Sequence, residues 1–217
     1  MDAVELIKAR RSIRKFKPTK VSREVVNAIL DLARWAPSAH NAQPWRIVVV
    51  DDEAVKARLA MAMGKAWLSD MLRDGVPREK AEDIVKVESW QRITESPVIL
   101  IVCLSMEDMH KYPDRRRRKA EYIIGVQSVA AYIQNLLLLA HYYGLGTCWV
   151  CAPLFCQSVV KKVLGLPREI EPQAMIMMGH PDEKPEPPPR KPLETFSAFN
   201  SWIRVGIIRG KRVKRGV

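Results

Sequence analysis

The feature that most constrains the fold is a long helical pattern in the middle of the chain, from about Arg116 to Tyr143. Its apolar residues recur at the spacing of one helix face, and from Leu136 to Leu139 they cover every side. A helix that is apolar on all sides is normally buried on all sides. Because a single small domain rarely surrounds one helix completely, the pattern predicts a core helix that a partner subunit helps to cover.

A nearly continuous apolar run from Pro97 to Leu104 predicts a central strand covered on both faces. Shorter runs predict strands at residues 46–50, 147–152 and 173–178. Helical spacing with capping residues predicts helices at residues 2–9, 23–35, 54–63, 64–95 (broken near 75–77) and 156–164. Strands and helices alternate without regular βαβ units. Since the sequence has neither a glycine-rich dinucleotide fingerprint nor a P-loop motif, we do not expect those two kinds of nucleotide site.

Length and composition are those of one globular domain: 217 residues, 47% hydrophobic and 28% charged. The first residues, Met1 to Glu5, lack the order of a signal peptide, and no apolar run approaches the ~18 residues of a membrane span, so we expect a cytoplasmic protein. The four cysteines fit no disulfide framework and no zinc pattern. We interpret them as buried, inert thiols, with redox chemistry of the Cys148-Trp149-Val150-Cys151 segment as the alternative, and predict no metal site.

The net charge of +12 raises nucleic acid as a partner. The charge is uneven, because residues 204–217 carry six basic and no acidic side chains. Apolar residues at Trp202, Val205, Ile207 and Ile208 favour an arm that packs on a partner subunit, with a short helix near Phe196 to Trp202. In that interpretation only residues 209–217 are free, and nucleic-acid binding through the tail is the alternative.

Two polar segments are candidate binding sites. Arg10, Arg11, Ser12 and Arg14 lie within five residues and suit a phosphate, although a solvated basic loop is the alternative. Between a helix and a strand, Pro37 and Pro44 bracket a loop dense in donors and acceptors, which suits a flat polar ligand. The alternative for this loop is a turn that satisfies its own backbone. Its polar residues are Ser38, His40, Asn41 and Gln43.

Taken in order, these segments and a third one resemble the motifs of the nitroreductase family of FMN-dependent oxidoreductases. The motifs read Arg10-Ser12-Arg14, then Pro37-Ser38-Asn41-Gln43-Pro44-Trp45, then Gly144-Leu145-Gly146-Thr147-Cys148-Trp149. The resemblance covers roughly residues 1–195. It implies an α+β fold in which helices wrap a central, mostly antiparallel sheet, and an intertwined homodimer. The long helix then corresponds to the dimer core. Residues 1–195 form an FMN-binding domain, and residues 196–217 form a C-terminal extension with the basic tail.

The resemblance also implies where FMN lies. The N-terminal segment and Arg190 meet the phosphate and ribityl chain, the proline-bracketed loop reaches the ring from the other subunit, and the third segment runs along the ring. The cofactor-binding residues are thus Arg10, Arg11, Ser12, Arg14, Pro37, Ser38, Ala39, Asn41, Gln43, Trp149, Val150, Cys151 and Arg190. No side chain is assigned as catalytic, because the cofactor performs the electron chemistry.

Some positions depart from the family pattern. Ala39 stands where many members carry a second Ser or Thr, and Pro188 stands where many carry a Lys. Further ring contacts have no clear counterpart, with Lys65 as one possibility. The implied activity is hydride transfer from NAD(P)H through FMN to a nitroaromatic, quinone or similar conjugated acceptor. Alternatives are a flavin- or deazaflavin-modifying or dehalogenating relative, and a flavin-associated protein whose basic tail binds nucleic acid.

Overall fold

The structure is a computed structural model that describes residues 2–202. Its contacts divide the chain into two units, Met1–Pro185 and Glu186–Val217. The first unit holds the sheet and the helices around it. The domain assignment to residues 1–195 and 196–217 stays a prediction. The basic tail and the arm residues from 203 onward lie outside the described residues.

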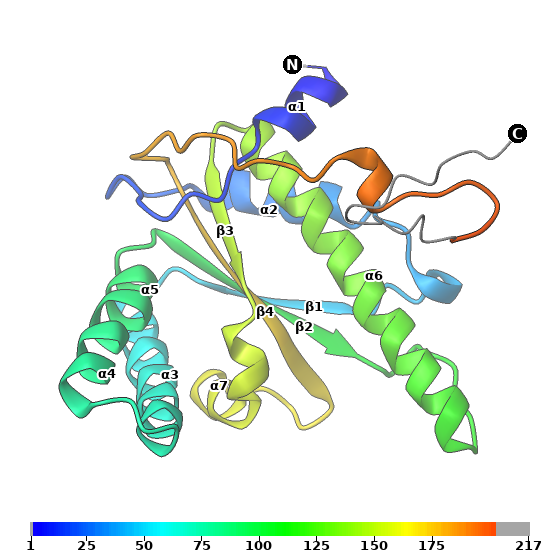
Figure 1. Ribbon diagram of the computed structural model, residues 1–217. Coiled ribbons are helices and arrows are strands. Elements are labelled where there is room, and N and C mark those ends of the chain that lie inside the picture. The colour runs from blue at the N-terminus through cyan, green and yellow to red at the C-terminus, as the bar shows by residue number, and fades with distance from the viewer. Residues whose placement is uncertain (1, 203–217) are drawn as a thin grey trace, which may run out of the picture. The chain divides into compact units, whose positions relative to one another are not determined.

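A four-stranded sheet forms the centre of the first unit (Figure 1). The strand order is β1-β2-β4-β3, and every pairing is antiparallel. Each residue of β2 is buried, as expected for a central strand. The predicted α+β fold with a mostly antiparallel sheet is therefore confirmed. The strands are β1 (Trp45–Val50), β2 (Val98–Ser105), β3 (Gly146–Val150) and β4 (Ile170–Gly179).

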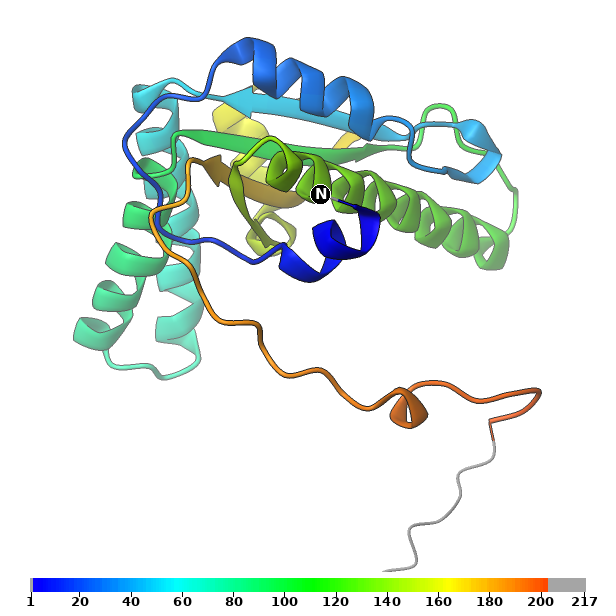
Figure 2. The ribbon, with the colours of Figure 1, turned by 90° about the horizontal axis from the view of Figure 1, so that it is seen from above.

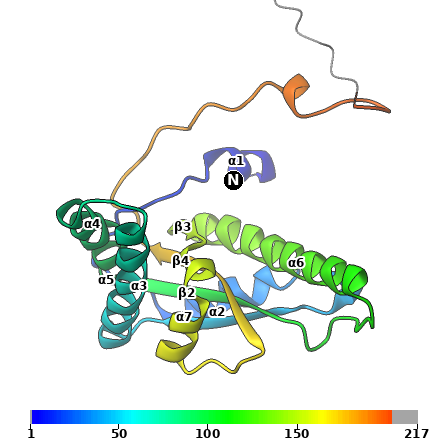
Figure 3. The ribbon, with the colours of Figure 1, turned by 60° about the horizontal axis from the view of Figure 1, so that its bottom comes forward.

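Helices cover both faces of the sheet. α2 and α6 lie alongside each other on one face (Figure 2), while α3 and α7 pack on the other and α3 to α5 gather at one end (Figure 3). Alternation along β2 sends Leu100 and Val102 to the first face and Ile99 and Ile101 to the second. The helices are α1 (Ala3–Ala9), α2 (Arg23–Ala33), α3 (Glu53–Arg73), α4 (Arg78–Val85), α5 (Arg92–Thr94), α6 (Arg115–Tyr142) and α7 (Gln157–Leu164).

Local signals set the helix ends. Asp2 caps α1 in a reciprocal capping box, and the side chains of Ser22 and Asp52 cap α2 and α3. Gly144 and Gly165 take left-handed φ angles of 76° and 63° just after α6 and α7. These caps satisfy backbone groups at the helix ends, which is why the helix starts could be predicted from the sequence.

Two predicted boundaries shift in the structure. β4 starts at Ile170, before the expected start at residue 173, whereas α3 runs without a break through the helical segments expected on either side of residue 63. β3 ends at Val150, before the expected end at Ala152, because Cys151 leaves the extended conformation and leads into the short 3-10 helix Ala152–Phe155.

The short helix expected near Phe196 to Trp202 is wrong. A 3-10 turn at Leu193–Thr195 comes before it, and residues 196–202 form bends without a helix. Asn200 has a left-handed φ of 64°, which is incompatible with a right-handed helix at that point.

A single chain does not bury α6 on all sides, so the expected cover by a partner subunit stays a prediction. Leu136 and Ala140 are fully buried against the sheet and α2, but Gln134 is exposed and Ile123 is 44% exposed. Among the described residues, α6 alone has the length and composition of a membrane span, a test that the core helix of a globular protein also passes. Its buried face marks it as a core helix, and the intertwined dimer stays a prediction.

Candidate functional site

The basic N-terminal segment is attached directly to β3. Ser12 pairs with Thr147 in a parallel bridge, and the backbone N–H of Ile13 donates to the Thr147 carbonyl at 2.9 Å. A Cβ on Gly146 would lie 2.8 Å from Ile13, so only glycine permits this approach without a shift. The segment is extended as predicted, and β3 fixes its position.

The same segment also contacts the chain that follows β4. Phe16 pairs with Pro181 in an antiparallel bridge, and the Glu183 carboxylate accepts the backbone N–H groups of Arg14 and Lys15. Residues 10–17 therefore run as a strap from the start of β3 to the end of β4, which limits where their side chains can reach.

A cavity of about 440 Å³ opens beside this strap. Arg10 and Arg11 line it together with His141, Gly146 and Thr147. The His141 Nε2 atom is buried without a hydrogen-bond partner, and burial and the charges of Arg10 and Arg11 lower the pKa of this imidazole. An unpartnered imidazole nitrogen beside two guanidinium groups fits an anionic ligand, with the neutral ring donating an N–H.

The four predicted phosphate-binding residues of the basic segment differ in their contacts and in their exposure. Arg11 turns back and donates to the carbonyls of Lys8 and Arg10 at the end of α1. Arg10 is half-buried, while Arg14 is exposed and does not line the cavity. Ser12 contributes through its backbone bridge to β3. The structure thus brings Arg10 and Arg11 to the cavity and places Ser12 and Arg14 next to it.

A second, largely apolar cavity of about 530 Å³ lies at the other end of β3. Val150 and Cys151 line it, as the sequence indicated for residues along a ring. Such an apolar cleft with a few polar groups is typical of a site for a flat aromatic ligand. α3, α5 and β4 form much of its wall, the segments around Glu88 and Phe155 form the rest, and Lys65 is not among the lining residues. The residues from these elements are Met63, Ala66, Trp67, Asp70, Arg92, Ile93, Met175 and Met177.

β3 connects the two cavities. Thr147 lines the basic cavity and Val150 lines the apolar cavity, and three residues of extended chain span about 10 Å. Trp149 points to the opposite face, where it packs with the α6 cluster, and its indole Nε1 is buried without a partner. Strand alternation therefore separates Trp149 from Val150, while Cys151 reaches the apolar cavity because the chain leaves the extended conformation at that residue.

The cysteines differ in exposure. Burial raises the pKa of Cys103 to about 12 and also raises the pKa of Cys148 and Cys156, so these thiols are unreactive. Cys151 is exposed beside the apolar cavity, and the expectation that all four are buried is wrong for this residue.

The proline-bracketed loop is held against α6, away from the linings of both cavities. The Ala39 N–H donates to Ser128 Oγ at 3.1 Å, and Ser38 Oγ accepts the N–H of Gln43 at 3.1 Å. Part of the loop therefore satisfies its own backbone. Pro37, Asn41 and Gln43 are exposed, and their contact with a ring bound to another subunit stays a prediction.

Two further points concern residues outside the cavities. Arg190 belongs to the second unit, and its predicted contact with a phosphate stays a prediction.

His40, His110 and Glu121 form a cluster whose possible ligand atoms lie within 4.8 Å of one another. Sequence reasoning missed this cluster because the three residues are widely spaced along the chain.

Comparison with known proteins identifies the family. The family model described as the nitroreductase family matches residues 7–180. The chain belongs to the nitroreductase family. A protein of Thermus thermophilus named NADH dehydrogenase is 32% identical over an alignment of 218 positions, gaps included. The alignment covers 89% of this chain and 94% of the relative. YfhC of Bacillus subtilis, whose name assigns it to the NAD(P)H nitroreductases, is 29% identical over 189 residues, covering 87% and 89% of the two chains.

Solved structures agree on the fold. A BluB-like flavoprotein from Clostridium difficile superposes with a TM-score of 0.74 at 26% identity, covering 93% of this chain and 100% of that one. The NADPH:FMN oxidoreductase of Vibrio harveyi gives a TM-score of 0.70 at 23% identity, covering 94% of this chain and 79% of that one. The resemblance seen in the motifs is confirmed, and the family and its named relatives support an oxidoreductase.

Proposed function

We propose that the protein is an FMN-dependent NAD(P)H oxidoreductase that reduces a nitroaromatic, quinone or similar conjugated acceptor. The observation that carries the proposal is the basic cavity at the start of β3, where Arg10, Arg11 and the unpartnered His141 Nε2 suit a phosphate, together with an apolar cavity at the other end of this strand. When bound, FMN supplies the ability to accept hydride from one molecule and pass it to another.

The residues of the chain hold and orient the cofactor. Arg10 and Arg11 offer positive charge at the basic cavity, and His141 offers an N–H to a phosphate oxygen. Methionines and Trp67 in the apolar cavity exclude water from one side of the ring. Arg92 lines the same cavity, but it is ion-paired with Glu88, and Asp70 and Asp74 also line it, so these residues supply no net positive charge to a reduced ring.

The proposal includes a homodimer. Trp35 is 78% exposed next to α2, and Ile123 is 44% exposed on α6. Exposed apolar side chains on two neighbouring helices are typical of an interface. A second copy bound there brings the exposed loop Pro37–Gln43 of one chain towards the cavities of the other, which accounts for the separation of the two predicted half-sites within one chain.

The test is to identify the ligand and then the acceptor. We expect a yellow protein that releases FMN on denaturation, as read by mass spectrometry, and whose flavin absorbance NADH or NADPH bleaches anaerobically. A colourless protein that FMN does not titrate contradicts the proposal. A panel of nitroaromatics, quinones, halogenated aromatics and deazaflavins, with product analysis, then separates reduction of an acceptor from flavin modification or dehalogenation.

A further inference from the structure

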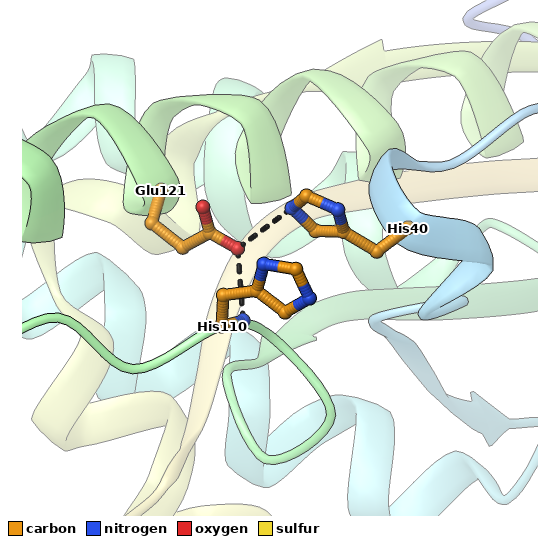
Figure 4. Close-up of side chains that lie close together, drawn as sticks. All are labelled: His40, His110 and Glu121. Carbon is orange, nitrogen blue, oxygen red and sulfur yellow. Dashed lines mark hydrogen bonds and ion pairs between the residues drawn. The ribbon is translucent and has the colours of Figure 1, made fainter.

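Three side chains with metal-binding atoms meet where the polar loop, the segment before α6 and α6 itself come together (Figure 4). His40 comes from the loop, His110 from the connection between β2 and α6, and Glu121 from the second turn of α6. His40 Nε2 lies 3.1 Å from Glu121 Oε1, and one atom from each residue falls within 4.8 Å of the others.

The carboxylate of Glu121 is the centre of the cluster. Its side chain is only 5% exposed, and a buried carboxylate needs donors or a cation as partners. The backbone N–H of His110 donates to Glu121 Oε1 at 2.9 Å. Carboxylates that bind metals are oriented by outer hydrogen bonds of this kind. Glu121 is therefore held in place with its charge directed at the two imidazoles.

We propose that His40, His110 and Glu121 form a binding site for a divalent transition-metal ion of the zinc type. Two imidazoles and one carboxylate are a common zinc ligand set, and they leave the fourth position to water. Bonds of about 2.0–2.1 Å in a tetrahedron place ligand atoms about 3.3 Å apart. The 3.1 Å between His40 Nε2 and Glu121 Oε1 is close to that spacing. The His40 side chain is 34% exposed, which gives an ion a route from solvent.

The site would secure the polar loop. His40, Asn41 and Gln43 have φ angles of 57°, 52° and 46°, a left-handed conformation that is rare for residues other than glycine. Such a conformation persists where the surroundings hold it. An ion that joins His40 to α6 provides that support, independently of any flavin.

A metal-free clamp is the competing explanation. In it, His40 donates directly to Glu121 while the His110 ring stacks on the His40 ring, with centroids 3.7 Å apart and planes 19° apart. The two explanations differ in their need for the His110 imidazole. The clamp uses the His110 backbone N–H, which any residue supplies, whereas the metal site requires a ring nitrogen.

His110→Ala is therefore the decisive variant. His40→Asn accompanies it, because asparagine tolerates the left-handed conformation at that position. Full-length protein with its bound flavin, treated with a chelator and dialysed, is titrated with Zn²⁺ alone by calorimetry, and Co²⁺ is used in parallel as a spectroscopic probe. We expect one ion per chain in the wild type. Since loss of an orienting partner alone costs about 10- to 100-fold in affinity, loss of either histidine should cost at least about 100-fold.

Two matched controls lie outside the cluster. His180→Ala and Cys151→Ser each remove a metal-binding side chain from another part of the fold and should bind Zn²⁺ like the wild type. Absence of saturable Zn²⁺ binding in the wild type overturns the proposal, as does equal affinity in His110→Ala or a loss of binding that follows Cys151→Ser instead. Flavin content measured in the same samples is a separate readout, so failure of the proposed oxidoreductase function is distinguishable from failure of the metal site.

Discussion

Replacing Gly146 with alanine tests whether the basic strap must lie directly against β3 for the cofactor site to form. An added Cβ would lie 2.8 Å from Cβ and Cγ1 of Ile13 and 2.9 Å from its Cγ2. These atoms belong to a β-branched side chain that is only 7% exposed, so rotation cannot remove the clash. The strap itself has to move away from β3.

The expected loss in the free energy of unfolding has two parts. Overpacking a tight contact typically destabilises the fold by about 1–3 kcal/mol. The outward movement also weakens the bond from the Ile13 N–H to Thr147, which is 2.9 Å long, at a net loss of about 0.5–1.5 kcal/mol. Gly146 is not among the glycines with positive φ, so the penalty is steric and not conformational. Because Arg10 and Arg11 move with the strap, we expect FMN affinity to fall by more than about tenfold.

Urea unfolding and FMN titration by fluorescence quenching measure the two effects. Gly125→Ala is the matched control, since its Cβ would meet flexible side-chain atoms of Leu104, Met106 and Met109 at 3.2, 3.3 and 3.6 Å. Ile13→Ala removes two of the three close atoms, so the double variant with Gly146→Ala should lose less stability than the sum of the single changes. Wild-type stability and FMN affinity in Gly146→Ala would refute the reasoning.

Three further predictions concern the basic segment, the exposed side of α6 and His141. Arg10→Ala should weaken FMN binding by roughly ten- to hundredfold, whereas Arg14→Ala should weaken it less, because this exposed side chain does not line the basic cavity; unchanged titrations in both would place the phosphate elsewhere. Ile123→Asp should leave the chain folded but prevent dimerisation in sedimentation, because this side chain is 44% exposed; Leu137, at 5% exposure, would instead report on the core of one chain. The lowered pKa of His141 means that the folded chain binds fewer protons than the unfolded chain, so this group makes stability fall as the pH drops below about 6.5. His141→Gln should therefore reduce the loss of unfolding free energy between about pH 7 and pH 5, and an unchanged pH profile would contradict the assignment.

Much of the fold could be predicted from local patterns. The apolar run of β2 and the caps Asp2, Ser22 and Asp52 act over a few residues, so the sequence shows them directly. The helical turns that carry Trp67 and Asp70 were also predicted, because residues 54–63 and 64–74 have helical patterns. The apolar cavity that these two residues line could not be predicted, because they meet Val150 only through tertiary packing.

Residues of the candidate site could be predicted only where a short sequence pattern determines the local backbone conformation. The extended strap and the end of β3 follow from short patterns, and the structure places Arg10, Arg11, Val150 and Cys151 at the two cavities. His141 could not be found in this way, because its role depends on an unpartnered nitrogen that arises when the strap crosses the end of α6. The cluster of His40, His110 and Glu121 likewise depends on tertiary packing.

α6 shows why the dimer prediction and the site prediction depend on each other. Its apolar residues exceed what one chain buries, since Leu136 is fully buried while Ile123 is 44% exposed. The loop that resembles the ring-contacting segment of the family is fastened to this same helix through Ser128 and Glu121. A partner that covers the exposed side of α6 must therefore also approach the loop at Asn41 and Gln43. If the chain dimerises through another surface, the loop stays remote from both cavities and the flavin site has to be completed by residues of the same chain.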